Sequence, residues 1–221
     1  MIRTGLLGGS FNPAHGGHRG ISLAALAALG LDEVWWLVSP GNPLKPKAGM
    51  APLAARLNAA ARVANGTRIR PTAIETELGT RYTIDTLRAI KARYLRRRFI
   101  WLMGADNLAQ LHLWRDWRGI AREMPIAVIA RPGYDGQARA AVAMGWLRRF
   151  ERPADRALEW TDWTLPAIVL LRFPADPRSA SAIRRGRPDW AAHEPLQLAH
   201  DPVTHRPLPF AGTPALPTET M

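Results

Sequence analysis

The segment between Gly8 and His18 contains the residues best suited to chemistry, and it reads GGSFNPAHGGH. It lies between an apolar run, residues 2–7, and an Ala- and Leu-rich stretch, residues 17–29. Glycines let backbone N–H groups approach a ligand, and the N-terminus of a following helix adds N–H groups and positive partial charge. The segment is therefore expected to cradle phosphate. It lacks the Gly-Lys-Ser/Thr of a Walker A loop and does not match the dinucleotide pattern GxGxxG.

Two imidazoles distinguish this segment from other phosphate loops. His15 and His18 are three residues apart, which places them on the same face of the first helical turn. An anion bound there would favour the charged or hydrogen-donating form of both rings. The alternatives are a metal site and two incidental surface histidines. A metal site would need further ligands, and the other histidines have no matching spacing.

Composition limits the class of protein. The chain has 221 residues, of which 47% are hydrophobic and 22% charged, so we expect one domain or a tight two-lobed one. The absence of cysteine excludes disulfide scaffolds, thiolate nucleophiles, iron–sulfur clusters and Cys-ligated zinc. The longest nearly apolar run, residues 21–31, is about half of a membrane span, and residues 1–10 lack a signal-peptide core. We therefore expect a cytoplasmic protein without a membrane partner.

The net charge of +12 implies an anionic partner. A positive field concentrates nucleic acids, membrane surfaces and small phosphorylated substrates alike, so charge alone does not choose between them. Residues 88–98 hold six basic residues and no acidic one. This run suits a solvated helix face at least as well as a docking patch.

Apolar runs and helical stretches alternate along the chain. Strands are predicted at residues 2–7, 33–38, 68–74, 99–103, 126–130 and 167–173, and helices at residues 17–29, 52–64, 83–94, 138–150 and 179–185. This alternation predicts βαβ crossovers and a parallel sheet that is covered on both faces. Because such sheets bind ligands beyond the carboxyl ends of their strands, the functional residues should follow the strands. The last 36 residues, 186–221, hold seven of the 19 prolines and are expected to form a poorly packed or extended tail.

The loop at residues 8–18 closely resembles the signature of the nucleotidyltransferase superfamily, whose HxGH motif binds the triphosphate of ATP. Residues 39–45 (SPGNPLK), 79–87 (GTRYTIDTL), 101–108 (WLMGADNL) with Trp114 and Trp117, and 130–134 (ARPGY) look like bacterial nicotinate-nucleotide adenylyltransferases. Residues 178–184 (RSASAIR) resemble the second phosphate motif, ISSTxIR, with Ser181 in place of the threonine. Arg178 and Ala180 depart from that motif. The resemblance covers residues 1–185 in the right order.

The resemblance implies an α/β fold with a doubly wound parallel sheet, the Rossmann-like nucleotidyltransferase fold, over residues 1–185. It implies adenylyl transfer from ATP to nicotinate mononucleotide, which gives nicotinate adenine dinucleotide and pyrophosphate, with Mg²⁺ arriving on the ATP. His15, His18 and Arg184 would be catalytic. ATP would contact Gly8, Gly9, Ser10, Phe11, Gly104, Asp106 and Ser181. Nicotinate mononucleotide would contact Asn42, Lys45, Tyr82, Thr83, Trp114 and Arg131.

This chemistry also suits the residues on physical grounds. The acceptor phosphate attacks the α-phosphorus itself, so the protein needs no nucleophile and must only align two anions and neutralise their charge. Trp114 would stack on the pyridine ring, although Trp114 and Trp117 at helical spacing also suit a core. Asp106 could equally be a helix N-cap, and residues 179–184 could be an ordinary cap with a surface arginine.

Two other functions stay open. A related enzyme could use another acceptor, such as nicotinamide mononucleotide, phosphopantetheine or a cytidylyl-accepting alcohol. A non-catalytic nucleic-acid binder could use the basic run at residues 88–98, but the chain has neither an aromatic-interleaved basic motif nor a helix-turn-helix pattern. We therefore expect small-molecule partners and no nucleic acid. A homo-oligomer is compatible with the sequence.

Overall fold

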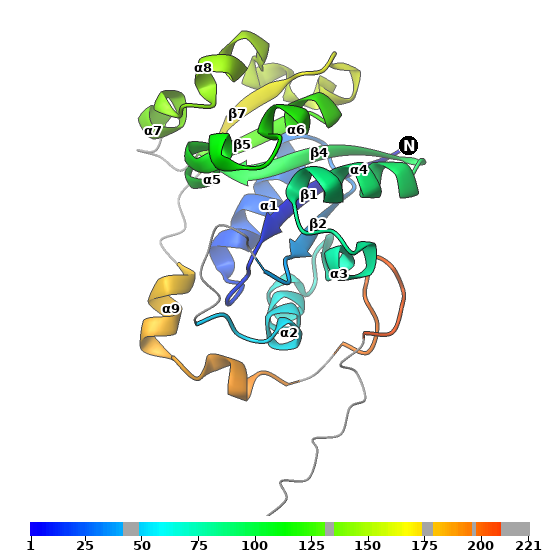
Figure 1. Cartoon of the computed structure of the whole chain (residues 1–221), viewed down its shortest axis with the longest axis vertical. Helices are drawn as coiled ribbons and strands as arrows, with labels where there is room; N and C mark the ends of the chain where they lie inside the picture. Colours follow the sequence, from blue (N-terminus) through cyan, green and yellow to red (C-terminus); the bar gives the residue numbers. More distant parts are fainter. Residues whose placement is uncertain (42–48, 131–134, 174–178, 196–197, 209–221) are drawn as a thin grey trace, which may run out of the picture.

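The computed structural model describes residues 1–41, 49–130, 135–173, 179–195 and 198–208. Within these residues one seven-stranded sheet has the order β3-β2-β1-β4-β5-β7-β6, and every neighbouring pair is parallel (Figure 1). The strands are β1 (Ile2–Gly9), β2 (Glu33–Val38), β3 (Ile69–Thr72), β4 (Arg97–Gly104), β5 (Ile126–Ala130), β6 (Glu151–Arg152) and β7 (Ile168–Arg172).

The sheet is doubly wound, as predicted. From β1 the chain moves outward to β2 and β3, then returns to the other side of β1 and continues through β4 and β5. The strand order therefore reverses between β1 and β4. In open α/β sheets, the crevice at such a reversal is where ligands bind.

Helices cover both faces of the sheet. The α-helices are α1 (Gly16–Ala28), α2 (Leu53–Ala64), α3 (Ile74–Leu78), α4 (Thr83–Arg93), α5 (Ala105–Gln110), α6 (Trp117–Glu123), α7 (Asp135–Ala140), α8 (Met144–Leu147) and α9 (Ala180–Gly186). The 3-10 helices are η1 (Leu111–Leu113), η2 (Arg148–Phe150), η3 (Ala154–Asp162) and η4 (Trp190–His193). Apolar side chains of α1, α2 and η3 pack on one face, and those of α3 to α8 pack on the other. In the described ranges, no helix has the length and apolar character needed to span a bilayer.

The single helix predicted at residues 138–150 is wrong. The structure breaks it into α7, α8 and η2. Ala141 and Ala143 are both buried, although residues two apart lie on nearly opposite sides of one helix. Interrupting the helix between α7 and α8 lets both side chains reach the core.

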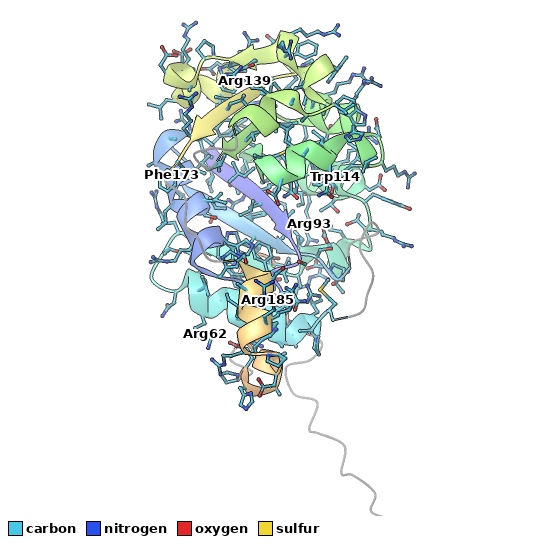
Figure 2. The ribbon with its side chains drawn as sticks, turned by 90° about the vertical axis from the view of Figure 1, so that its left-hand side faces the viewer. Arg62, Arg93, Trp114, Arg139, Phe173 and Arg185 are labelled. Atoms are coloured by element: carbon cyan, nitrogen blue, oxygen red, sulfur yellow. The ribbon has the colours of Figure 1, made fainter. Side chains whose placement is uncertain are left out.

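The described residues after Gly186 fold back onto the domain, which differs from the expected poorly packed tail. Trp190 in η4 is buried, and η4 lies beside α2 (Figure 2). Val203 and Leu208 enter the two core clusters. The expectation of a poorly packed tail rested on proline content, which does not reveal apolar anchors at such wide intervals.

Asp201 anchors this returning segment. Its side chain is only 3% exposed and accepts hydrogen bonds from the Thr72 hydroxyl at 2.9 and 2.8 Å and from the Ala73 N–H at 2.9 Å. It also accepts the N–H groups of Val203 at 2.8 Å and Thr204 at 3.0 Å. A carboxylate 128 residues away in sequence thus satisfies donors at the start of α3.

We expect Asp201→Asn to lower the free energy of unfolding by about 3 kcal/mol, because an amide has one acceptor oxygen and turns its NH₂ toward donors. Urea unfolding of the full chain measures this change. Asp189→Asn is the matched control, because Asp189 is exposed in the same returning segment. Equal stability of the two variants would contradict the anchoring role of Asp201.

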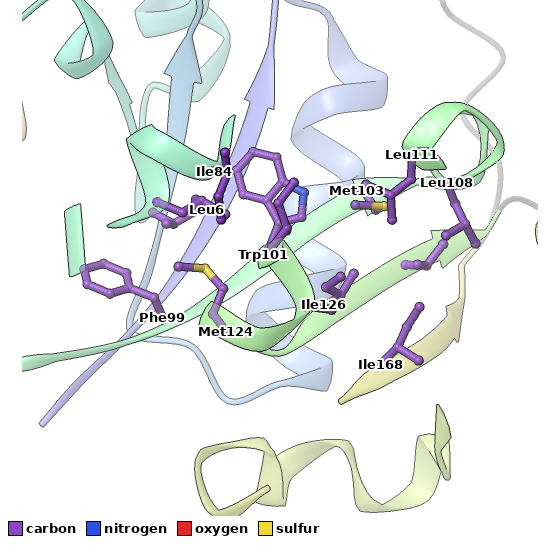
Figure 3. Close-up of a cluster of buried hydrophobic side chains, with 14 of the residues drawn as sticks. Leu6, Ile84, Phe99, Trp101, Met103, Leu108, Leu111, Met124, Ile126 and Ile168 are labelled. Atoms are coloured by element: carbon purple, nitrogen blue, oxygen red, sulfur yellow. The ribbon is translucent and has the colours of Figure 1, made fainter. Parts of the chain in front are cut away.

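The core supports the carboxyl end of β1. Trp101 on β4 is 3% exposed and packs with Leu6 and Ile84 in the cluster on the α4 face (Figure 3). A Cβ at Gly8 would lie 2.5 Å from the Trp101 ring. Gly8 therefore permits the close approach of backbone and indole, and a larger residue there would displace one of them.

Candidate active site

A cavity of about 390 Å³ lies beyond the carboxyl ends of the central strands. Its lining includes Gly8 and Gly9 at the end of β1, Ser10 directly after β1, and Ser39 and Gly41 after β2. The other lining residues are Glu75, Arg81, Tyr82, Thr83, Trp101, Asn107, Leu113, Trp114 and Arg115. The cavity is thus at the strand reversal, where the α/β pattern predicts a ligand.

The loop after β1 bends sharply at Phe11. Phe11 has a positive φ of 46°, which is strained for a residue with a side chain, and its ring is 1% exposed. The ring stacks on Trp36 at 4.9 Å between centroids and contacts His18 at 4.8 Å. Phe11, predicted to bind ATP, therefore lies beneath the loop and supports the histidine with its ring.

His15 and His18 cap the first turn of α1. The Nδ1 atom of His15 accepts the Gly17 N–H at 3.1 Å, and the Nδ1 atom of His18 accepts the His15 N–H at 3.2 Å. The ring centroids are 4.0 Å apart. Because both Nδ1 atoms accept hydrogen bonds, a proton on each neutral ring belongs on Nε2. Each ring is thus arranged to donate an Nε2–H at the positive end of a 13-residue helix.

Arg184 meets this loop although it follows it by 172 residues. One of its Nη atoms donates to the Asn12 carbonyl at 2.5 Å, and the other donates to the Ser181 hydroxyl at 3.3 Å. Ser179, the N-cap of α9, accepts the Ala182 N–H. The N-cap of α9 is therefore Ser179, while Ser181, predicted to contact ATP, accepts a hydrogen bond from the guanidinium. His15, His18 and Arg184 are outside the lining of the cavity, along the loop that continues from Ser10.

The opposite wall of the cavity is aromatic and basic. Tyr82 and Thr83 begin α4, so the free N–H groups of its first turn lie at this wall. Arg115 lies over the Tyr82 ring, with its guanidinium carbon 4.6 Å from the centroid. Trp114 packs edge-on against Trp101 and lines the cavity, whereas Trp117 packs on Trp146.

The other predicted site residues fall into two groups. Gly104 and Asp106 lie at the carboxyl end of β4, with Asp106 exposed and Asn107 turned into the cavity lining. A Cβ on Gly104 would collide with the Asp106 carboxylate. The predicted residues Asn42, Lys45 and Arg131 lie outside the described residues.

Glu75, Asn107 and Arg115 line the cavity but were not predicted as site residues. Glu75 is the polar residue directly after the predicted strand at 68–74, so the strand-end rule could have found it. Burial raises the pKa of Glu75 to about 7, against the opposing effect of hydrogen bonds with Ser39 and Thr86. In the described part of the chain, no group of three His, Asp or Glu side chains is close enough to hold a metal ion.

A buried guanidinium holds the two glycine-containing loops together. Arg56 on α2 is 1% exposed and donates to the carbonyls of Ser10 and Ser39, both at 2.7 Å, and of Ala51 at 2.9 Å. Burial lowers its pKa to about 10, which leaves it charged at neutral pH. Arg56 therefore places a positive charge directly behind the loops that follow β1 and β2.

We expect Arg56→Met to lower the free energy of unfolding by about 3 kcal/mol, because it leaves three partly buried carbonyls without their donor. The KM values for both substrates should rise as the two loops lose their common anchor. Arg62→Met is the control, because Arg62 is exposed on the same helix and pairs with Glu194. Unfolding by urea and steady-state kinetics measure both effects, and an Arg56→Met protein as stable as Arg62→Met would refute the anchoring role.

Comparisons with known proteins decide the family. A family model described as cytidylyltransferase-like matches residues 6–186. A protein of Erythrobacter litoralis named "Probable nicotinate-nucleotide adenylyltransferase" is 62% identical over 205 residues, which are 93% of this chain and 94% of the relative. The chain belongs to the nicotinate-nucleotide adenylyltransferase family. A second member with the same name, from Parvibaculum lavamentivorans, is 50% identical over 86% of this chain and 94% of its own length.

Solved structures agree on the fold. The Plasmodium falciparum nicotinic acid mononucleotide adenylyltransferase complexed with NaAD superposes with a TM-score of 0.61 at 17% identity, over 84% of this chain and 83% of that chain. The same enzyme complexed with APC gives a TM-score of 0.59 at 16% identity, over the same shares. The nicotinate-nucleotide adenylyltransferase family thus shares this Rossmann-like nucleotidyltransferase fold, while the segment after residue 186 lies beyond the family model.

Proposed function

We propose that this chain transfers the adenylyl group of ATP to nicotinate mononucleotide and releases pyrophosphate, in the biosynthesis of NAD. The observation that supports this function best is a glycine loop that ends in two histidines placed to donate hydrogen bonds. The loop lies beside a cavity lined by aromatic side chains and by the first residues of α4. The first feature suits a polyphosphate and the second suits a flat ring that bears a carboxylate. The names of the close relatives support the same assignment.

His15, His18 and Arg184 act on the triphosphate. An oxygen of the acceptor phosphate forms a bond to the α-phosphorus, and the bond from that phosphorus to the bridging oxygen of pyrophosphate breaks. The Nε2–H groups of the histidines and the remaining N–H groups of Arg184 stabilise the charge that develops on the transferring and leaving phosphates. Ser10 and the neighbouring glycine N–H groups align the nucleotide.

The acceptor occupies the cavity. Its pyridine ring stacks on Trp114. Its carboxylate accepts hydrogen bonds from N–H groups at the start of α4, around Tyr82 and Thr83. Asn42, Lys45 and Arg131 contact its phosphate or ring. Stacking of this kind contributes about 1 kcal/mol beyond area burial.

Mg²⁺ enters as part of the substrate Mg-ATP. The ion keeps several waters and binds phosphate oxygens, so one or two protein carboxylates suffice. Asp106 is exposed at the carboxyl end of β4 and offers oxygen ligands of the kind that Mg²⁺ prefers. Asp106 orients the metal-bound phosphates or accepts a hydrogen bond from a ribose hydroxyl.

The partners of the enzyme are these small molecules. The basic run at residues 88–98 forms ion pairs: Arg88 and Lys91 with Glu123, Arg93 with Glu77, and Arg97 with Glu33. Four of its six basic residues therefore have acidic partners within the fold, which favours a structural role over a nucleic-acid surface.

Pyrophosphate release from Mg-ATP tests the function. We expect release with nicotinate mononucleotide, slower release with nicotinamide mononucleotide, and none without an acceptor. Faster release with the nicotinamide analogue would identify nicotinamide mononucleotide as the acceptor. Salt-dependent binding to single-stranded or duplex DNA without any release of pyrophosphate would instead show that the protein is a nucleic-acid binder.

A further inference from the structure

Glu75 occupies a position that the reaction described above leaves unexplained. It is the second residue of α3 and lines the cavity together with Tyr82, Thr83 and Trp114. Its carboxyl group hydrogen-bonds with the side chains of Ser39 and Thr86. A carboxyl group therefore shares the cavity with the residues expected to hold a carboxylate-bearing ring.

The hydroxyl groups beside Glu75 also have carbonyl neighbours on the main chain. Ser39 Oγ is 2.9 Å from the Gly41 carbonyl, and Thr86 Oγ1 is 3.3 Å from the Tyr82 carbonyl. Each hydroxyl has one proton to donate. A neutral Glu75 donates its own proton to one hydroxyl, which then keeps its bond to the main chain. Hydrogen bonds donated by both hydroxyls favour the ionised form, but burial of the carboxyl group outweighs them and favours the neutral form.

The charge of Glu75 changes close to neutral pH. Burial raises its pKa to about 7. Other charged or titratable groups lie in the same region. They are Arg81 before α4, Tyr82 at its start, Asp85 within it, Arg115 before α6, and Arg56 behind Ser39. Asp85 pairs with Arg115 and Arg56 bonds to main-chain carbonyls.

We propose that Glu75 determines acceptor specificity: its neutral form admits a ring that bears a carboxylate, and its ionised form repels that ring. The proposal rests on the proposed function. Nicotinate and nicotinamide mononucleotide share the ribose and the phosphate and differ only in carboxylate against amide. Both rings carry a positively charged pyridinium nitrogen, which an ionised Glu75 attracts, and only the nicotinate ring also bears a carboxylate, which an ionised Glu75 repels.

The direction of the pH effect follows from linkage. A bound carboxylate raises the proton affinity of Glu75. The preference for nicotinate mononucleotide is therefore greatest below the pKa of Glu75 in the free enzyme and falls as the pH rises above it. With that pKa near 7, the ratio of kcat/KM for nicotinate to that for nicotinamide mononucleotide falls about tenfold between pH 6 and pH 8. Titration of the shared phosphate cancels in this ratio.

The test measures this ratio from pH 6 to pH 9 in the wild type, in Glu75→Gln and in Glu77→Gln. Glu77 lies on the same helix, outside the cavity lining, and pairs with Arg93 and Arg206. We expect the fall in the wild type and in Glu77→Gln, and a ratio independent of pH in Glu75→Gln. A constant wild-type ratio, or the same fall in Glu75→Gln, would overturn the proposal.

Two readouts keep the alternatives apart. No pyrophosphate release with nicotinate mononucleotide at any pH would refute the proposed function, whereas release with an unchanged pH profile would refute only the role of Glu75. Calorimetry at pH 8 in buffers of different ionisation enthalpy measures proton uptake when nicotinate mononucleotide binds. We expect uptake by the wild type, and none by Glu75→Gln; a purely structural Glu75 would alter thermal unfolding without this difference in proton uptake.

Discussion

His18→Ala is expected to lower kcat by about 10²- to 10³-fold, the usual cost of removing one preorganised donor from a developing oxyanion. The Nδ1 atom of His18 is engaged by the His15 N–H, and Phe11 supports the ring from below. The ring orientation is thus fixed before ATP arrives, which is what makes its Nε2–H effective. Steady-state release of pyrophosphate at saturating substrates measures the loss.

The same substitution should alter stability much less. It removes one capping interaction, worth about 1 kcal/mol, and therefore lowers the unfolding temperature by about 2–4 °C. His193→Ala is the control, because His193 is exposed on η4 and contacts Asp189 of the same segment. A His18→Ala enzyme with wild-type kcat would show that His18 has no catalytic role.

Arg184→Ala is expected to lower kcat/KM for ATP by about 10²-fold, with a smaller loss for Arg184→Lys. The guanidinium has five N–H groups, and its bonds to Asn12 and Ser181 hold the planar fork beside the loop. In the proposed reaction its remaining N–H groups bind the leaving phosphates. A lysine keeps the charge and loses the bidentate geometry.

Arg185→Ala provides the comparison for Arg184. Arg185 is exposed on the same helix (Figure 2), so its loss should leave turnover near the wild-type value. If Arg184→Ala and Arg185→Ala were equally active, the general positive charge of α9 would be sufficient and the bonds to Asn12 and Ser181 would have no catalytic meaning. A fall in kcat/KM for ATP confined to Arg184→Ala separates the two cases.

Local patterns in the sequence were sufficient for the sheet and for the loop after β1. Alternating apolar runs predicted six of the strands, and the strand-end rule predicted where the cavity lies. β6 escaped prediction because it has two residues. Trp114 and Trp117 show the limit of spacing: both fit one helix face, yet one lines the cavity and the other packs on Trp146.

Residues with distant partners could not be predicted in this way. Arg56 bonds to Ser10 across 46 residues, and Asp201 bonds to Thr72 across 129. Both are polar residues that the chain buries because their acceptors or donors are supplied by other elements of the fold. Hydrophobic periodicity does not reveal such a partner, so the sequence did not single out Arg56 and favoured a poorly packed tail.

A crystal structure of the enzyme with Mg²⁺ and an ATP analogue that resists cleavage at the α-phosphorus tests the central claim most directly. The account predicts phosphate oxygens within about 3 Å of the Nε2 atoms of His15 and His18 and of a guanidinium nitrogen of Arg184. A triphosphate bound elsewhere, with these three side chains turned away from it, would contradict the account.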